Sequence, residues 1–353
     1  MSTEQSLTVR APVRIDFAGG PSDMAPFCVD EWGYVVNAAI ARYATVTVRR
    51  RADAQVILAS ADLGRRETYA SPAALRHDSP LRLITRAVEM AGVDHGLEVT
   101  VRTDVPPGSG LGASAAVSVA LLHALRTLRG ETGLRREDLA NDGIALETGR
   151  LQNAGGGQDQ WAAAFGGVAG LRFAAGGSAR QALDLPPDTL RALADSLVLC
   201  YSGTSRISGD LLASIMARYT QGDAAAQRDL RALREIALRI QAALLVGRVD
   251  TLGPLMTEAW VAFQALQPAI STPVIARIFE VALAAGATGG KAMGAGGGGC
   301  VLLACAPGRQ AAVTGALRDA GFTLLPVQFA ESGVRVDQGT DETDLRQPAS
   351  DGP

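Results

Sequence analysis

Apolar and polar residues alternate along several stretches of the first half of the chain. Leu97–Thr103 (LEVTVRT) alternates most clearly, and Leu7–Phe17 alternates with Val, Ile and Phe among its members. A period of two predicts strands with one buried face. Val35–Arg50 is rich in Val, Ala and Thr and predicts one long or two short strands. Shorter apolar runs predict strands at Gln55–Ser60, Val168–Phe173 and Leu197–Tyr201.

Helical periodicity dominates the second half. Apolar residues recur three and four positions apart in RALREIALRIQAALL, and about 205–285 is predicted to be mostly helical. Strands at Thr288–Met293 and Cys300–Cys305 follow, and a last helix and strand are expected between 308 and 328. In the first half, the predicted helices are Pro80–Ala91, Arg136–Arg150 and Ala113–Leu128, the last of which is Ala-rich and long enough to be buried.

The length and the order of these elements indicate two domains. At roughly 150 residues per domain, 353 residues suggest two, and the linker-like stretch LDLPPDTL (183–190) divides a strand-rich half from a helix-rich half. We therefore expect an α+β fold with an N-terminal domain over 1–190 and a C-terminal domain over 191–336. Residues 337–353 are polar without apolar period and predict a frayed tail.

Composition narrows the classes of function. Hydrophobic residues make up 47% and charged residues 20%, which excludes disorder throughout. The formal net charge of −3 argues against a protein held on nucleic acid by phosphate contacts. A small anion needs only local amides and one or two cations, so anion binding stays open. No apolar run reaches the ~18 residues of a membrane span, and Met1–Arg10 lacks the order of a signal peptide, so we expect no membrane partner.

Cysteine and histidine usage points away from metal and disulfide chemistry. The four cysteines form no CxxC pair, which fits reduced thiols in a cytoplasmic protein. The three histidines lie in unrelated contexts and give little support to a histidine metal site or a Ser-His-Asp triad. These residues are Cys28, Cys200, Cys300, Cys305, His77, His95 and His123.

Three glycine-rich segments are the candidates for chemistry: Arg14–Asp23 (RIDFAGGPSD), Pro106–Ala116 (PPGSGLGASAA) and Lys291–Gly299 (KAMGAGGGG). The second follows a predicted strand and opens a predicted helix, whose free amides and dipole would face an anion. A Walker A string is absent from the chain. The pattern G-x-G-x-x-[GA] fits Gly110–Ala115 and Gly294–Gly299, but the first leads into two successive helices and the second into a strand, so neither has a dinucleotide-binding context.

Tight turns are the alternative explanation of these glycines. One such loop alone would favour that explanation. The chain has a second run of four consecutive glycines, in which Gly297 and Gly298 have no evident role in the fold. Because each glycine costs conformational entropy on folding, contact with a ligand is the favoured reading.

With all three motifs in this order, the sequence resembles the GHMP kinase family over roughly Thr8 to Gln328, and PPGSGLGASAA is specific for it. RIDFAGGPSD, GGGQDQWAAAFGG (Gly155–Gly167) and KAMGAGGGGC look most like the branch of D-glycero-D-manno-heptose 7-phosphate kinases and L-fucokinase-type enzymes. The resemblance implies an N-terminal domain like ribosomal protein S5 domain 2, a ferredoxin-like C-terminal domain, and ATP and substrate in the cleft between them.

The resemblance also implies a nucleotide site. The cradle for the phosphates of ATP would be formed by Pro107, Gly108, Ser109, Gly110, Leu111, Gly112, Ala113 and Ser114. Ser114 and Glu147 would offer a hydroxyl and a carboxylate to Mg²⁺, which takes hard oxygen ligands and few protein groups. On the residues alone, Ser114 can be a plain helix cap and Glu147 a solvated helix position. Ala113 stands where many members have a first serine.

Two residues match the family's catalytic pair. Asp159 in GGGQDQ corresponds to the aspartate that takes the proton of the attacking hydroxyl. Arg14 corresponds to the cation that pairs with this aspartate or steadies the transferring phosphoryl group. Without the resemblance, Asp159 reads as a helix N-cap and Arg14 as a surface charge at the end of a strand.

The implied substrate contacts are spread over the chain. Asp16 and Asp23 would accept hydrogen bonds from sugar hydroxyls, and Asp23 matches the family's sugar-binding aspartate. Arg206 at a helix start can bind a phosphate already on the substrate, or be an exposed arginine. The expected substrate-binding residues are Asp16, Gly19, Gly20, Asp23, Gly157, Arg206, Gly296 and Gly297. Lys291 is assigned no role.

The predicted function is phosphorylation of a sugar or sugar phosphate at its anomeric hydroxyl by an ATP- and Mg²⁺-dependent kinase, foremost a D-glycero-D-manno-heptose 7-phosphate 1-kinase. The alternatives are an L-fucose-like hexose 1-kinase, a cyclitol phosphate kinase, a catalytically silent binding module and the decarboxylase branch of the same fold. Retention of Arg14, Ser114, Glu147 and Asp159 argues against the silent module. The partner is thus a small molecule, and the chain is expected to be a monomer or a homodimer.

Overall fold

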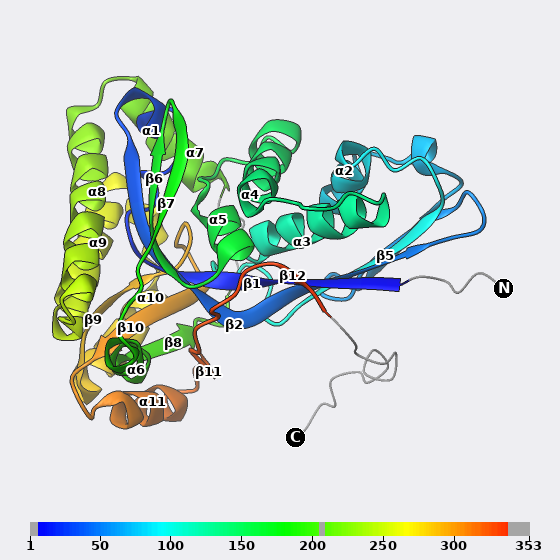
Figure 1. The fold of residues 1–353 in the computed structure, drawn as a ribbon. Coiled ribbons are helices and arrows are strands. Elements are labelled where there is room, and N and C mark those ends of the chain that lie inside the picture. Colours follow the sequence, from blue (N-terminus) through cyan, green and yellow to red (C-terminus); the bar gives the residue numbers. More distant parts are fainter. Residues whose placement is uncertain (1–5, 205–208, 338–353) are drawn as a thin grey trace.

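The computed structural model describes residues 6–204 and 209–337, which form two sheets with helices packed on and between them (Figure 1). The first sheet belongs to the N-terminal half, apart from one short strand that returns from the end of the chain. Its strands are β1 (Ser6–Ala18), β2 (Gly33–Arg50), β3 (Val56–Ser60), β4 (Arg65–Tyr69), β5 (Leu97–Thr103), β6 (Val168–Ala174), β7 (Gly177–Ala182) and β12 (Arg335–Val336).

Strand β2 is one long strand and organises the first sheet. Its second half pairs with β5 and its first half with β6, while β1 pairs antiparallel along nearly all of it. The β1–β2 register shifts between Pro12 and Val13, where proline offers no amide hydrogen, and again between Asp16 and Ala18. The second irregularity comes just before the turn that contains Gly19 and Gly20, so β1 ends within the first glycine-rich segment, directly before its two glycines.

The helices of the first half are α1 (Phe27–Asp30), α2 (Arg82–Met90), α3 (Ala113–Leu128), α4 (Arg136–Ile144) and α5 (Gln158–Phe165). Helix α3 lies on β1 and β2, and α4 and α5 pack on α3 (Figure 1). Ala116, Ala120 and Ala124 are fully buried, which confirms the predicted buried helix. The helix predicted over Arg136–Arg150 is α4 followed by a π-helical turn over Ala145–Arg150.

The second sheet has the strand order β11-β8-β10-β9, with every neighbouring pair antiparallel. Helices separate β8 from β9 and β10 from β11, which is the β-α-β-β-α-β sequence of a ferredoxin-like unit. Its elements are α6 (Pro187–Ser196), β8 (Leu197–Tyr201), α7 (Gly209–Thr220), α8 (Ala224–Leu245), α9 (Leu252–Leu266), α10 (Pro273–Ala285), β9 (Ala287–Ala292), β10 (Cys300–Cys305), α11 (Gln310–Asp319) and β11 (Thr323–Leu325).

Helices α8 and α9 join the two sheets. Helix α8 packs on β2 and on α9, and α9 packs on β9 (Figure 1). A single buried apolar cluster therefore runs from Val36 in the first sheet through Ile240 in α8 to Leu302 in the second sheet. This continuous core fixes the segment between β9 and β10 against the loop before α3.

The division of the chain differs in two respects from the predicted domain bounds. The boundary at residue 190 falls inside α6, because the two prolines read as a linker stand at the start of a helix, where proline is favoured. After β11 the chain returns to the first sheet, where Ile40 bridges Phe329 and β12 pairs with β1. Residues 326–336, which were expected in the C-terminal domain, thus lie against the N-terminal sheet.

Candidate active site

The glycine turn between β5 and α3 presents backbone to an open cavity. Gly108, Gly110 and Gly112 have φ values of +71°, +76° and +73°, and Gly112 immediately precedes the first turn of α3. The turn is held from behind by the chain at the end of the third glycine-rich segment, because the amide of Cys300, directly after Gly299, donates to the carbonyl of Ser109 over 2.8 Å. The first amides of α3 are therefore available at the end of a buried helix, which favours an anion.

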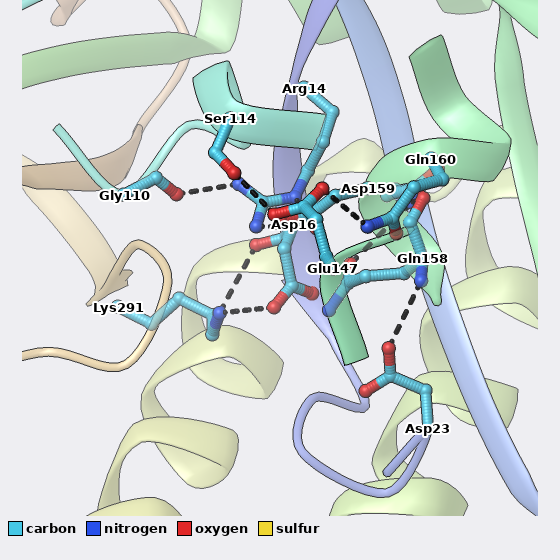
Figure 2. Close-up of polar contacts among 11 residues, drawn as sticks. Arg14, Asp16, Asp23, Gly110, Ser114, Glu147, Gln158, Asp159, Gln160 and Lys291 are labelled. Atoms are coloured by element: carbon cyan, nitrogen blue, oxygen red, sulfur yellow. Dashed lines mark hydrogen bonds and ion pairs between the residues drawn. The ribbon is translucent and has the colours of Figure 1, made fainter. Parts of the chain in front are cut away.

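Arg14 in β1 joins this turn to α5. Its Nη1 donates to the carbonyl of Gly110 over 2.6 Å, and its backbone amide donates to the carbonyl of Leu111 over 2.9 Å. Its Nε and Nη2 lie 2.7 and 2.6 Å from Oδ1 of Asp159. The side chain is buried, so a single arginine fixes the position of the aspartate relative to the turn (Figure 2).

Asp159 stands in the first turn of α5 and remains 26% exposed at its side chain, which opens to the cavity. Both bonds from Arg14 end on Oδ1, so Oδ2 does not take part in them. A Cβ added at Gly112 would lie 3.1 Å from Oδ2 of Asp159. Because of its positive φ and this close approach, Gly112 has little tolerance for a side chain.

Glu147 and its partners form a second polar cluster beside the turn. Ser114 Oγ donates to Oε2 of Glu147, Ser118 Oγ donates to Oε1 over 3.0 Å, and Gln160 Nε2 donates to Oε1 over 2.9 Å (Figure 2). Burial raises the pKa of Glu147 and the charge of Asp159 adds to this, while the three donors lower it. Serine and glutamate oxygens that touch at the cavity wall are the type of ligands that Mg²⁺ takes.

Asp23 lies under the loop that precedes α5. The amide of Gln158 donates to Oδ2 of Asp23 over 3.1 Å. Burial raises the pKa of Asp23 to about 7, and the charges of Asp159 and Asp16 act in the same direction. A Cβ added at Gly156 would lie 1.9 Å from Oδ2 of Asp23, so only glycine leaves room for this carboxyl group.

Asp16, two residues after Arg14 on β1, has a cation of its own. Lys291 in β9 places Nζ 2.9 Å from Oδ2 of Asp16 and 3.3 Å from its carbonyl oxygen (Figure 2). Both side chains are almost completely buried. Oδ1 of Asp16 is buried without a hydrogen-bond partner in the described structure.

These groups line one cavity of about 670 Å³, between the glycine turn, α5 and the segment after β9. Its wall includes Arg14, Asp16, Gly20, Asp23, Gly108, Ser109, Gly110, Gly112, Ala113, Ser114, Glu147, Asp159, Gly294 and Ala295. A side cavity of about 350 Å³ shares Asp23 and the 153–156 loop with it and extends toward Met24, Cys28, Phe173 and Met216.

Most of the predicted site residues are brought together, but not all. The structure places Gly19 against Tyr34, and Gly296 and Gly297 against Ile270, away from the cavity wall. Leu111 is buried in the core, Pro107 lies beside the turn, and Gly157 lines the side cavity only. Arg206 lies outside the described residues.

The expectation that Gly297 and Gly298 have no role in the fold is wrong. The amide of Gly297 donates to the carbonyl of Ile270 over 2.7 Å. A Cβ added at Gly298 would lie 2.9 Å from the carbonyl oxygen of Thr204. The glycine run is needed to fit between these backbones and the glycine turn before α3.

Sequence reasoning missed the residues that support the predicted ones. Ser118 and Gln160 hold Glu147, Lys291 holds Asp16, and Nδ2 of Asn37 donates to the carbonyl of Gln158. Of these contacts, the sequence gives a sign of one: Ser114 and Ser118 are four residues apart on a predicted helix, so their side chains share one face. The others depend on contacts between distant segments.

Among residues 6–204 and 209–337, no three His, Cys, Asp or Glu side chains gather into a metal-binding group. None of the helices described has the length and the apolar character needed to cross a membrane.

Sequence models of a known family match both halves of the chain. The model of the GHMP kinase N-terminal domain matches residues 80–167, and that of the GHMP kinase C-terminal domain matches residues 240–322. The chain is 30% identical over 261 residues to the mevalonate kinase of Pyrococcus horikoshii, which covers 72% of this chain and 73% of that protein.

Two further relatives are named for sugar substrates. The chain is 26% identical over 340 residues to the D-glycero-alpha-D-manno-heptose 7-phosphate kinase of Campylobacter jejuni, covering 94% of this chain and 98% of that protein. It is 29% identical over 319 residues to the bifunctional fucokinase/GDP-fucose pyrophosphorylase of Arabidopsis thaliana, covering 84% of this chain. The chain spans only 29% of the length of that plant protein.

Solved structures share the fold. A D-glycero-D-manno-heptose 1-phosphate kinase from Bacteroides thetaiotaomicron superposes with a TM-score of 0.78 at 24% identity, covering 95% of this chain and all of that one. The galactokinase of Lactococcus lactis in complex with galactose gives a TM-score of 0.75 at 20% identity, covering 94% of this chain and 95% of that one. These likenesses support the two-domain arrangement.

Proposed function

The chain belongs to the GHMP kinases, a family of ATP-dependent phosphotransferases, and from that premise we propose that it transfers the γ-phosphoryl group of ATP to the anomeric hydroxyl of a sugar or sugar phosphate. The observation that supports this most is the double contact of Arg14, which ties the carboxylate of Asp159 to the glycine turn. A base for the acceptor hydroxyl is thereby held at a fixed place relative to an anion site.

The triphosphate would lie along Gly108–Ser114. Phosphoryl transfer depends mainly on positioning and on electrostatic stabilisation, and this turn offers backbone amides from three left-handed glycines together with the N-terminus of α3. Ser109 adds a buried hydroxyl at the cavity wall whose Oγ has no partner among the described atoms. We assign the phosphate contacts to this turn.

Mg²⁺ fits the donor set of Ser114 and Glu147. Both are oxygen ligands, they touch each other, and Ser114 stands on the cavity wall where the phosphates would lie. One hydroxyl and one carboxylate suffice, because Mg²⁺ keeps several waters and takes the remaining oxygens from phosphate. When bound, the ion would neutralise negative charge on the phosphates.

Asp159 and Arg14 would perform the proton transfer and hold the geometry. The oxygen of the anomeric hydroxyl forms a bond to the γ-phosphorus while the bond from that phosphorus to the bridging oxygen of ADP breaks. The hydroxyl proton passes to Asp159 late in the reaction, since a carboxylate is a weak base for an alcohol. Arg14 keeps Asp159 in place through Oδ1 and offers positive charge at the phosphoryl group.

The acceptor would lie against Asp16, Gly20 and Asp23 on the other side of Asp159. The carboxyl groups of Asp16 and Asp23 both line the cavity, so they can form hydrogen bonds with a ligand that has several hydroxyls. With a pKa near 7, Asp23 exists in both protonation states around neutrality, so it can donate or accept. This arrangement favours a polyhydroxy acceptor.

The first candidate acceptor is D-glycero-D-manno-heptose 7-phosphate, because the Campylobacter jejuni relative of that name matches over almost its whole length. The side cavity favours a second candidate, an L-fucose-like 6-deoxyhexose. The described residues around it are mostly apolar, including Met24, Cys28, Phe173 and Met216, and none of them is a lysine or an arginine. Such a wall suits a methyl group better than a phosphate.

A screen of ATP consumption over hexoses, 6-deoxyhexoses, heptose phosphates and cyclitol phosphates tests the proposal. We expect turnover with a heptose 7-phosphate or an L-fucose-like sugar, and phosphorus NMR of the product should locate the new ester at the anomeric carbon. Turnover of mevalonate alone, or an ester at another hydroxyl, would contradict the proposal.

A further inference from the structure

The chain contains a single lysine. Of its 33 Lys and Arg residues, 32 are arginines, and the remaining one is Lys291. Its side chain is 2% exposed, and its partners are Oδ2 and the carbonyl oxygen of Asp16. In a sequence that uses arginine for its other cations, this one position has an ammonium group, and it contacts Asp16 in the wall of the candidate active site.

An ammonium group suits this place physically. It is a compact point charge with three donors, whereas a guanidinium is planar, larger and brings five donors that need partners when buried. Lys291 lies in β9 opposite Leu302 of β10, and the space beside it ends at Asp16 of β1. The carboxylate and the backbone carbonyl of Asp16 accept from a lysine there, while an arginine would leave more of its five donors without a partner.

The pair leaves one acceptor free. Oδ2 of Asp16 is held by Lys291, while Oδ1 is buried and has no partner in the part of the chain that the structure describes. Asp16 belongs to the cavity wall together with Gly20 and Asp23. An unpaired buried acceptor is costly, and a ligand hydroxyl in the cavity would satisfy it.

We propose that Lys291 is a positioning residue for the acceptor sugar: it pairs with Oδ2 of Asp16 and orients that carboxyl group, so that Oδ1 receives a sugar hydroxyl. This inference rests on the proposed function. Lys291 belongs to the second sheet and Asp16 to the first. The contact of Asp16 with the sugar therefore depends on how the two sheets pack against each other. Lys291 is not among the residues of the cavity wall, so it acts on the sugar through Asp16.

The kinetic test compares the Michaelis constants for sugar and for ATP. The sugar is whichever of L-fucose and D-glycero-D-manno-heptose 7-phosphate the wild-type protein turns over. Lys291→Met should raise the KM for that sugar about tenfold or more, with the KM for ATP within about threefold. Lys291→Arg should not restore the sugar KM. Arg126→Met, which breaks a partly exposed ion pair with Asp142 away from the cavity, should leave both constants unchanged.

A second variant covers the case in which Lys291→Met fails to fold, since it leaves Asp16 buried and unpaired. Asp16→Asn/Lys291→Met removes both charges and should fold, but it should keep the raised KM for sugar. A double variant with the wild-type sugar KM would overturn the proposal.

The single lysine also gives a direct spectroscopic readout. In untagged wild-type protein labelled with [¹⁵N]lysine, one Nζ signal is expected, and its burial should slow proton exchange enough to detect it. Saturating sugar should shift this signal, whereas ADP alone should not. A purely structural lysine would show no response to sugar, and that result would overturn the proposal.

The outcomes separate this inference from the function on which it rests. If the wild-type protein turns over neither sugar, the proposed function fails and the role of Lys291 fails with it. If the wild-type protein is active but the sugar KM of Lys291→Met and the Nζ signal are both unaffected, only the role of Lys291 is rejected.

Discussion

The two sides of the cavity present different chemistry to their ligands. On one side, which we call the phosphate side, Gly108–Ser114 offers mainly backbone from one continuous turn. The other side, which we call the acceptor side, presents the carboxyl groups of Asp16 and Asp23. Gly20 and Gly156 lie against these groups and leave room for them. Asp159 and Arg14 stand between the two.

This difference explains how one family can keep its nucleotide and change its acceptor. A turn that binds through backbone amides depends on glycine conformation and changes little with side-chain substitution. The acceptor side depends on a few carboxyl groups whose positions rest on distant partners, Gln158 for Asp23 and Lys291 for Asp16. Variants on the two sides should therefore separate effects on ATP from effects on sugar.

The largest effect is expected at Asp159, which serves both sides. Asp159→Asn should lower kcat about a thousandfold, because the base for the acceptor hydroxyl is lost, while the KM for ATP stays within about threefold. Steady-state kinetics with saturating sugar measure both. Asp142→Asn, at a carboxylate outside the cavity wall, is the control and should keep the wild-type kcat. Equal activity of Asp159→Asn and wild type would remove the role of the base.

A smaller and more selective effect is expected at Gly156. A Cβ there would overlap Oδ2 of Asp23, so Gly156→Ala should raise the KM for sugar about tenfold through displacement of that carboxyl group. The KM for ATP should stay the same. Gly155→Ala is a matched control, since a Cβ at Gly155 meets nothing within 4 Å. Similar kinetics of the two alanine variants would show that Asp23 does not bind the acceptor.

On the phosphate side, Ser114→Ala should raise the Mg²⁺ concentration at half-maximal activity about tenfold. The hydroxyl of Ser114 contacts Glu147 at the cavity wall, so its loss removes one of the two oxygen ligands that we propose for Mg²⁺. A Mg²⁺ titration at fixed ATP and sugar measures this. Thr127→Ala, near the other end of α3, should have no effect. An unchanged Mg²⁺ requirement in Ser114→Ala would show that Ser114 serves only as a hydrogen-bond donor to Glu147.

The smallest effect concerns pH and stability. The pKa of Asp23 is raised to about 7 by burial, so between about pH 4 and pH 7 the folded protein binds a proton that the unfolded chain has released. The contribution of Asp23 to the free energy of unfolding therefore falls as pH rises through this window, by at most about 1.4 kcal/mol per pH unit, and levels off above it.

Denaturant titrations at several pH values measure this contribution as the difference between wild type and Asp23→Asn. The difference should fall from pH 4 to pH 7 and stay constant above pH 7. A difference that does not depend on pH in this window would show that Asp23 is ionised throughout and would place the acceptor side in a more polar environment.

The phosphate side could be predicted from the sequence because its signals are local. The strand Leu97–Thr103, the glycine turn and the helix Ala113–Leu128 follow one another directly, and both elements have the predicted bounds. Arg14 and Asp159 are 145 residues apart, and nothing in periodicity or spacing pairs them. Only the resemblance to the family suggested that they meet.

The acceptor side could be predicted only in part. Lys291 and Asp16 are 275 residues apart, and the tertiary packing of the two sheets brings them together. Helix α5 was not among the predicted helices, although Asp159 was considered as a helix N-cap, because eight residues with the sequence QDQWAAAF are too short for a clear apolar period. The fold requires glycine at 297 and 298 because the backbones of Ile270 and Thr204 lie close to them. No local sequence pattern connects these two residues with the glycines.

The most direct test of the central claim is a crystal structure with Mg²⁺, a non-hydrolysable ATP analogue and the acceptor sugar. The account predicts the triphosphate along Gly108–Ser114 and the acceptor hydroxyl within hydrogen-bond distance of Asp159, between that carboxylate and the terminal phosphorus. A triphosphate bound elsewhere, or a carboxylate of Asp159 directed away from the acceptor hydroxyl, would contradict it.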